Sequence, residues 1–520
     1  MTDTEPTGQA ARRRPAGRHS QSARRRPSGR AQYRRGGNPI GVRMAALVGV
    51  VVIVVGIWIL STAVGAPARP AAPLVTDGVS IPAGNASSSS LFCAGGAAGF
   101  GGLAGTSIYL TNTTAKPVKG VMTARVAPGT SGGATSTGTP GAPSLLPVEV
   151  PPMGTTAVNP AAGLGAGDVA ASFVFAGGGV TANQVVTGTG GWSNAPCASQ
   201  VATSWYFAGG STSPGNVLTL DLFNPTSTDA VMNVSFLTGS AVITPSAYQG
   251  LVVPAGHLVS ENVGDFVQNQ GEIATMISAQ STAVVADELQ QWSSGSTGGV
   301  ALRLGSPSPS TVWHFAQTTN SNRGTVTFHV ANPGSRPGVA TFDIGVPSAS
   351  IVPIQVPVPA QSEVALIASA SSRLPRSSPY AVTVTSSVGM VVSRSVQAPN
   401  GSAPPLWGSI PGTTTTSTHW LVPGPGSGTA PGTPHAAVAS LAVANSGSSP
   451  AQVHVSTFGT GAPVSSFTVA PGGLVVLNSN QVGGLQAYEV TSTRPVSVEE
   501  DDSPAAAPGI VSFAGVPFSS

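Results

Sequence analysis

Residues 218–237, LTLDLFNPTSTDAVMNVSFL, contain two runs in which apolar and polar residues alternate, separated by a short polar turn. Alternation with a period of two places successive side chains on opposite faces of a β-strand. An Asn in the turn can bond nearby backbone through its own side chain, and Pro restricts the chain beside it. The stretch therefore predicts an antiparallel hairpin. Six side chains are expected in its core: Leu218, Leu220, Leu222, Met232, Val234 and Phe236.

The same pattern recurs along the chain with a period of a little over a hundred residues. Each copy opens on an apolar or aromatic segment, continues through the Asn hairpin, and then has a Pro-containing turn and a late strand. The opening segments are LFCAGG at 91–96, WYFAGG at 205–210, WHFAQT at 313–318 and HWLVPG at 419–424. The turn residues are Asn112, Asn224, Asn332 and Asn445.

Four copies of about 105 residues, each with some seven short strands, predict tandem antiparallel β-sandwiches and little helix. The expected domains are 91–200, 201–312, 313–418 and 419–520, strung in sequence, and residues 201–312 are expected to fold alone. Trp at the opening strands is interpreted as filling the seams between domains, with ligand platforms as the alternative. These tryptophans are Trp205, Trp313 and Trp420.

An uncharged run at 45–64, AALVGVVVIVVGIWILSTAV, is long enough to cross a bilayer as a helix. We expect a transmembrane helix at 44–65, retained as an anchor, with a cleaved signal peptide as the alternative. Arg residues directly before it predict a cytoplasmic amino terminus and an extracytoplasmic remainder. Residues 66–90 have the composition of a linker.

Charge is distributed unevenly about this run. Residues 1–43 hold eleven Arg against Asp3 and Glu5, a net +9, which leaves −6 for the rest of a chain whose total is +3. The tail is expected to be disordered and to contact the anionic cytoplasmic leaflet, with nucleic-acid binding by the tail as the alternative. The acidic remainder argues against nucleic acid as its ligand.

The chain has two cysteines, Cys93 and Cys197, which are 104 residues apart and flank the first copy. In the predicted topology both lie outside the cytoplasm, where oxidised cysteines are expected. The sequence therefore predicts a disulfide between them, with free, metal-bound or catalytic thiols as the alternative.

No motif for catalysis, cofactor or metal is found. The seven His show no metal-ligand spacing, and His329 and His454 are expected on outer faces of strands. The acids at 499–502 are interpreted as an unstructured turn, with a calcium site as the alternative. Asp287 and Glu288 are neighbours on one predicted strand and would point to opposite faces, which excludes a carboxylate pair acting across a cleft. The sequence thus predicts no enzyme, no cofactor and no metal site.

The order NP, V-x-V-x-F, VPAG and VV-x-x-E resembles the immunoglobulin-like modules of bacterial surface proteins. The whole layout, with its Arg-rich tail, single apolar run and LFCAGG opening, resembles an uncharacterised family of actinobacterial membrane-anchored secreted proteins. That resemblance implies no activity and no site residues. The third copy departs at VPAQ, and the fourth lacks the Asn-Pro pair.

Three functions fit these observations. The first is a non-enzymatic, single-pass cell-envelope protein in which a rod of four sandwiches acts as a surface scaffold or spacer. The second is a receptor for an envelope glycan or peptidoglycan. The third is an accessory subunit of a membrane complex for cell-wall assembly. Exposed aromatics would favour the glycan, and a contiguous apolar patch would favour a protein partner.

Overall fold

The computed structural model describes residues 78–98, 103–128, 142–188, 191–239, 241–294, 297–320, 324–346, 351–397, 407–424, 436–482, 486–504 and 510–518. All of them belong to one compact unit, Pro73–Ser520. Their regular structure is all β, in antiparallel sheets, apart from three 3₁₀ turns. The described part contains no helix that is long and apolar enough to cross a membrane. The expected tail, the helix at 44–65 and the linker as far as residue 77 lie outside the described residues.

The strands form four successive pairs of sheets, here called the first to fourth sheet pair. In the first pair one sheet has the order β1-β7-β4-β5, with β2 on β7, and the other has the order β6-β3-β8-β9. The bounds are β1 (Ser89–Cys93), β2 (Ala97–Ala98), β3 (Leu103–Asn112), β4 (Val118–Pro128), β5 (Ser144–Val150), β6 (Gly154–Val158), β7 (Gly167–Phe175), β8 (Val180–Gly188) and β9 (Gly191–Pro196).

The second pair repeats this layout. Its sheets are β10-β16-β12-β13, with β14 on β12, and β15-β11-β17-β18. The bounds are β10 (Ser204–Gly210), β11 (Val217–Phe223), β12 (Ala230–Leu237), β13 (Val242–Ile243), η1 (Ser246–Tyr248), β14 (Gln249–Val253), β15 (Leu258–Asn262), η2 (Val263–Asp265), β16 (Ile273–Ala279), β17 (Val285–Ser294) and β18 (Thr297–Leu304).

In the third and fourth pairs one long strand, β24 or β31, takes part in both sheets. The third pair has β19 (Ser310–Thr319), β20 (Thr325–Asn332), β21 (Gly338–Gly345), β22 (Ile354–Val358), β23 (Ser362–Ile367), η3 (Ala368–Ala370), β24 (Pro379–Gln397) and β25 (Trp407–Pro411). The fourth has β26 (Ser417–Val422), β27 (Ala436–Ala444), β28 (Ala451–Thr457), β29 (Pro463–Val469), β30 (Leu474–Asn478), β31 (Tyr488–Pro504), β32 (Val511–Ala514) and β33 (Val516–Pro517).

The hairpin predicted at 218–237 is the centre of the second pair's core. Its strands are β11 and β12, and they lie in different sheets that face each other across that core. The expected six core side chains are all fully buried there, which confirms the face assignment made from alternation. The expectation that β11 and β12 pair directly is wrong, because each instead pairs with other strands of its own sheet.

The opening tryptophans lie in the core of their own sheet pair, so their interpretation as seam fillers is wrong. Each indole N–H donates to a carbonyl of the late strand or the segment before it in the same pair. Trp205 donates to Val284 at 2.9 Å, Trp313 to Met390 at 2.9 Å and Trp420 to Val496 at 2.9 Å. A buried indole needs such an acceptor, and a carbonyl inside the pair supplies it.

The turn asparagines have the same surroundings in all four pairs. In the second pair Asn224 is fully buried, and its Oδ1 accepts from the N–H of Thr226 at 3.0 Å. Its Nδ2 donates to the carbonyls of Thr228 at 2.8 Å and Val253 at 2.9 Å. One amide therefore closes the turn and ties it to the strand before the Pro-containing turn, which explains why both features recur together. The equivalent bonds are made by Asn112, Asn332 and Asn445.

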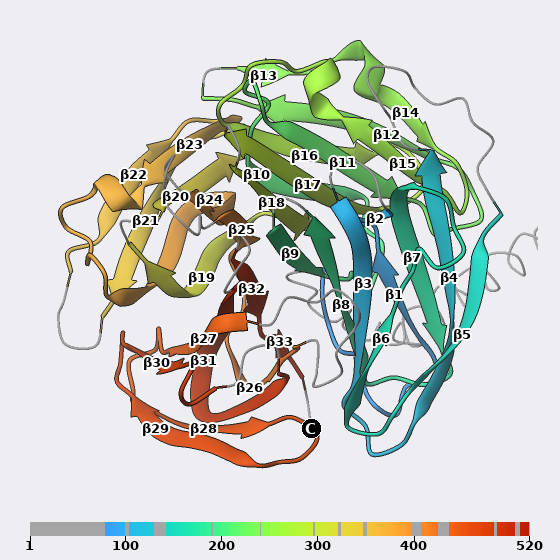
Figure 1. Cartoon of the computed structure of the whole chain (residues 1–520). Coiled ribbons are helices and arrows are strands. Elements are labelled where there is room, and N and C mark those ends of the chain that lie inside the picture. Colours follow the sequence, from blue (N-terminus) through green and yellow to red (C-terminus); the bar gives the residue numbers. More distant parts are fainter. Residues whose placement is uncertain are drawn as a thin grey trace, which may run out of the picture. The chain divides into compact units, whose positions relative to one another are not determined.

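The four sheet pairs follow one another around a cycle (Figure 1). The last strand of the inner sheet in each pair, β9, β18, β25 or β32, lies near its centre. There β18 lies against β9 and β25, and β32 lies against β25 and β9. The fourth pair thus contacts the first, so the rod expected from the sequence is wrong for the described residues.

Candidate functional site

The contacts between successive sheet pairs, here called seams, are built from equivalent positions. One position lies three residues before the turn Asn. The other is the residue directly opposite it on the late strand of the same pair. The two face the pair that precedes them in the cycle. From the first to the fourth pair these partners are Tyr109 and Asn183, Asp221 and Asp287, His329 and Ser393, and Ala442 and Glu499.

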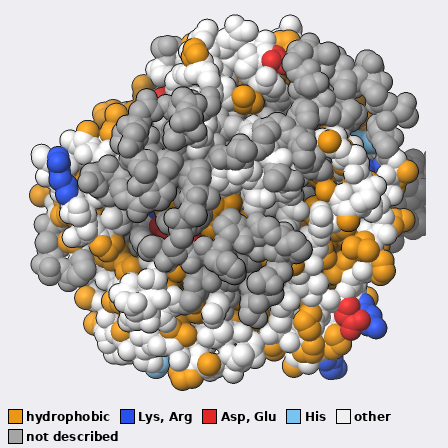
Figure 2. Space-filling view, in the orientation of Figure 1, with side chains coloured by type: hydrophobic (Ala, Val, Ile, Leu, Met, Phe, Trp, Pro, Cys, Tyr) orange, Lys and Arg blue, Asp and Glu red, His pale blue; other side chains and the backbone are white. Residues whose placement is uncertain are grey.

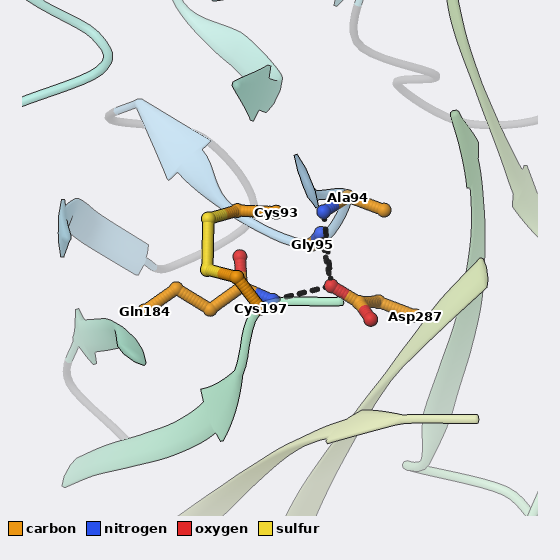
Figure 3. Close-up of a disulfide and its surroundings, with 6 residues drawn as sticks. All are labelled: Cys93, Ala94, Gly95, Gln184, Cys197 and Asp287. Carbon is orange, nitrogen blue, oxygen red and sulfur yellow. Dashed lines mark hydrogen bonds between the residues drawn. A yellow bond between two sulfur atoms is a disulfide. The ribbon is translucent and has the colours of Figure 1, made fainter. Parts of the chain in front are cut away.

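In the first seam, between the first and second pairs, Asp287 binds the end of the opening segment of the first pair (Figure 3). Its Oδ2 accepts from the backbone N–H of Ala94 at 3.1 Å and of Gly95 at 2.6 Å, and from the side-chain amide of Gln184. A Cβ on Gly95 would lie 2.5 Å from Leu302 and 2.9 Å from Asp287. Glycine is required here because the next pair approaches the backbone so closely.

The disulfide between Cys93 and Cys197 is adjacent to this contact (Figure 3). It holds the residue directly before Ala94 to the segment that leaves β9, and both cysteines are buried in the first core. The bridge therefore fixes the strand end whose N–H groups bind Asp287. Both sulfurs are in the bridge, so neither cysteine is a free thiol in this structure.

The first seam gathers buried carboxyl groups. Burial raises the pKa of Asp287 to about 7, although its hydrogen bonds to Gln184, Gly95 and Ala94 oppose the shift. Burial, and after it the charge of Asp168 from the first pair, raise the pKa of Asp221 well above its ordinary value. The pKa of Asp168 is also raised by burial. Folding at this seam is thus coupled to proton uptake.

In the second seam, between the second and third pairs, the acid comes from a different strand. Ser393 donates to the carbonyl of Ala208 at 2.7 Å, and Glu363 of β23 accepts from the N–H of Gly209 at 2.5 Å. Gly209 has φ +79°, and a Cβ there would lie 2.5 Å from the His329 ring. Glycine is again required by backbone conformation and close approach.

His329 and Glu363 lie in the second seam beside Glu272, which directly precedes β16 of the second pair. One ligand atom from each of the three lies within 4.8 Å of the others. The sequence interpretation placed His329 on an outer strand face, and the residue does lie on the face away from the core of its own pair. That face is covered by the second pair, so His329 is 3% exposed rather than open to solvent. His454 is exposed, as expected.

In the third seam, between the third and fourth pairs, Glu499 binds a charged donor. Its Oε1 accepts from Arg394 at 2.6 Å, and its Oε2 from the N–H of Gln317 at 3.3 Å. Burial raises the pKa of Glu499 to about 7; Arg394 opposes this shift, and Asp501 adds to it. Ala442 packs in the same seam against Ala316 of the third pair.

The acids at 499–502 are buried parts of β31, so their interpretation as an unstructured turn is wrong. They pair in register with β27, from Ala442 opposite Glu499 to Ala439 opposite Asp502. Burial, and then the charges of Asp502 and Asp501, raise the pKa of Glu500 well above its ordinary value. Four consecutive acids show no alternation with apolar residues, so the sequence did not indicate that a strand runs through them.

The closing seam, between the fourth and first pairs, is mostly apolar in the part of the chain that the structure describes. Tyr109, Val185 and Trp192 of the first pair pack into the core of the fourth pair. Asn183, equivalent to Asp287, donates to the carbonyl of Pro423 at 3.4 Å. Pro423 is equivalent to Ala94 of the first opening segment. Because proline has no backbone N–H, one of the two donors that Asp287 uses in the first seam is missing here.

Asp287 and Glu288 do point in different directions, as expected from their adjacency. Glu288 faces the core of the second pair, where it bonds Arg303 and accepts from Thr275 at 2.9 Å. The Arg303 guanidinium also donates to the carbonyl of Ala208 in the opening segment of the second pair. Burial raises the pKa of Glu288, and Arg303 opposes the shift. These residues have structural partners rather than a common open cleft.

A cavity of about 80 Å³ lies where the four inner strands meet. Its lining includes Leu302 and Leu304 of β18, Ile410 of β25 and Ala514 of β32. Sites for drug-sized ligands have about 300–1,000 Å³. The cavity therefore offers no room for a ligand of that size.

Comparisons with known proteins give no activity. A family model described as a family of unknown function (DUF5719) matches residues 156–362. No curated protein matches the chain. A crystal structure of Thermotoga maritima 1070 is similar at 14% identity with a TM-score of 0.18, covering 20% of this chain and 93% of that one. A tetra-tandem repeat in the extending region of a large adhesion protein is similar at 11% identity with a TM-score of 0.10, covering 79% and 94%.

Proposed function

We propose that the chain is a non-enzymatic cell-envelope scaffold whose four sheet pairs are immunoglobulin-like sandwiches joined into one body. The observation that carries this proposal is the use of the buried ladder partners. Asn183, Asp287, Ser393 and Glu499 each bind the opening segment of the preceding pair. Polar groups that could serve an open site are instead used to join the pairs, which favours a rigid platform over a flexible spacer.

The scaffold is proposed to be held at the membrane by residues 44–65, with residues 1–43 on the anionic cytoplasmic leaflet and the sheet pairs outside. Added protease should then digest the sheet pairs of permeabilised cells and spare the tail. Full protection of the sheet pairs would contradict this topology.

The scaffold function is tested by crosslinking the protein in cells and identifying its neighbours. A variant with a weakened closing seam, Asn183→Asp, should stay in the membrane fraction and lose neighbours that the wild type retains. An unchanged set of neighbours, or turnover of an envelope substrate by the purified full chain, would contradict the proposal.

A second candidate, the accessory subunit, is favoured by an apolar patch on the outer face of the first pair. Val121 lies opposite both Val174 and Pro147 in the ladders, and Leu145 continues the patch along β5. The exposed fractions of Val174 and Leu145 are 58% and 66%. Hydrophobic side chains gather at the lower right of Figure 2, on the side where Figure 1 places β4 and β5. A patch of this kind is typical of a protein contact.

A photo-crosslinking residue at position 174 should capture one discrete partner, and the same residue at the exposed position 367 should not. Equal capture at both would contradict the accessory role. The glycan receptor has less support, since the exposed large apolar side chains of the described residues include one aromatic, Phe266. Saturable retention of the full chain on purified envelope glycan would favour that alternative.

A further inference from the structure

The acid of the second seam lacks the side-chain donor that the acids of the first and third seams have. In the first seam the acid receives the amide of Gln184, and in the third it receives the guanidinium of Arg394. In the second seam Glu363 is 2% exposed and receives the N–H of Gly209 on Oε1, while its Oε2 has no hydrogen-bond partner among the described residues. Burying a carboxylate oxygen without a donor costs free energy, and a cation bound at this position would offset that cost.

The surroundings of Glu363 contain a second carboxylate and a ring nitrogen. Glu272 Oε2 lies 2.7 Å from Nδ1 of His329, and that Nδ1 makes no hydrogen bond in spite of the short distance. His329 and Glu363 share one face of their sheet, because Ala331 stands opposite Glu363 and His329 opposite Ala365. Three potential ligand atoms therefore converge from both sides of one seam.

The other nitrogen of His329 is already held. Its Nε2 lies 2.8 Å from the hydroxyl of Ser395. If Nε2 carries the proton and donates to Ser395, the lone pair of Nδ1 points toward the two carboxylates. Outer partners of this kind orient the imidazole in metal sites.

We propose that Glu272, His329 and Glu363 bind one divalent transition cation, for which Zn²⁺ is the probe. One imidazole nitrogen and two carboxylates suit such an ion better than Mg²⁺ or Ca²⁺, which prefer oxygen ligands throughout. The ion neutralises the two carboxylates and joins the second pair to the third. Glu272 is 46% exposed on its side chain, so solvent completes the coordination.

Tetrahedral coordination with bonds of about 2.0–2.1 Å separates two ligand atoms by roughly 3.3 Å. The Glu272 oxygen, now 2.7 Å from Nδ1, has to move outward by less than about 1 Å. Glu272 is the most exposed of the three ligands and can make this adjustment. Glu363 and His329 are held by Gly209 and Ser395 and can stay in place.

The test uses the full chain without a histidine tag, treated with chelator and then dialysed against Zn²⁺. Elemental analysis should find one bound ion per chain, and Zn²⁺ should raise the melting temperature. His329→Ala and Glu363→Gln should abolish both effects. Ser395→Ala should weaken binding roughly 10–100-fold, the usual effect of losing an outer partner.

His419 and Glu489 provide the matched control, because they form a His–carboxylate pair at 2.6 Å that no third ligand joins among the described residues. His419→Ala should keep the bound ion. Glu272→Gln, at a half-exposed position, should fold and lose the ion even if a change at a buried ligand prevents folding. No bound Zn²⁺ in the wild type, or equal binding in Glu272→Gln and wild type, would overturn the proposal and leave a simple His–carboxylate contact.

Discussion

In the first seam Asp287 accepts hydrogen bonds from two backbone N–H groups, whereas in the closing seam Asn183, at the equivalent ladder position, donates one to the carbonyl of Pro423. The first seam is rich in carboxyl groups, and the closing seam is mostly apolar. The side chain at this position thus matches the backbone group that it meets. The comparison teaches that equivalent seams can keep one geometry while exchanging donor for acceptor.

The largest loss of stability is expected from removing the disulfide, which lies beside the first seam alone. The double variant Cys93→Ser, Cys197→Ser opens a loop with a sequence separation of 104 residues. In the chain-entropy model such a loop contributes up to about 4.7 kcal/mol to the free energy of unfolding. Urea unfolding of the full chain measures this loss, and reduction of the wild type should reproduce it. A loss below about 1 kcal/mol would contradict the model.

Replacing the hydrogen-bond donor of the closing seam with an acceptor should have the next largest effect on the free energy of unfolding. Asn183→Asp places a carboxylate against the Pro423 carbonyl, and the loss of the donor should cost about 2–3 kcal/mol at pH 7. At pH 5 the cost should shrink, because a protonated carboxyl donates again. The exposed Asn159 uses only its Oδ1, toward Ala161, so Asn159→Asp is a control that should change little. Equal losses in the two variants would remove the basis of the comparison.

The turn asparagines test whether the two sides of the closing seam are equally stable. Asn112→Ala in the first pair and Asn445→Ala in the fourth both remove the three bonds that the two turns share, and each should cost about 2 kcal/mol. Denaturant unfolding of the two variants measures both costs. Values that differ by several-fold would show that the pairs do not share one turn chemistry.

The smallest effect is expected from Asp287→Asn, which keeps the acceptor and removes the ionisable group. The pKa of Asp287 in the folded protein is about 7, which lies above the ordinary value of 3.8. The stability that comes from its bound proton is therefore full below about pH 4 and is lost as the pH rises to about 7. Wild-type stability from this group falls over that range, and the variant should show a flatter profile. Burial lowers the pKa of His314 to about 4, which acts in the opposite direction in both proteins and cancels in their difference. Parallel profiles would contradict the assignment.

Sequence patterns predicted the parts of the fold that depend on neighbours in the chain. Alternation at 218–237 identified the buried face correctly, and the two cysteines predicted their bridge. The same patterns did not show which strands pair, because alternation is the same whichever neighbour a strand has. They also suggested a rod, since a repeat period carries no information on whether the last copy meets the first.

The seam residues were missed for a related reason. His329 alternates with apolar neighbours like any outward side chain, and its face is buried only because another pair covers it. One signal was available in the opening segments: Gly95 and Gly209 stand at equivalent places, and glycine at a strand end indicates close approach of another backbone or side chain. Glu363 and Glu272 had no such signal, because they lie far apart in the sequence.

The contact between β9 and β32 joins residues more than three hundred positions apart. Contacts of such long range form late, because a large loop must close before they can contribute. A chain that emerges from its amino-terminal side can complete the first three pairs while Asn183, Val185 and Trp192 still face water. During that interval the first pair presents an unfinished apolar surface, which is a point at which a chaperone or a neighbouring chain can bind.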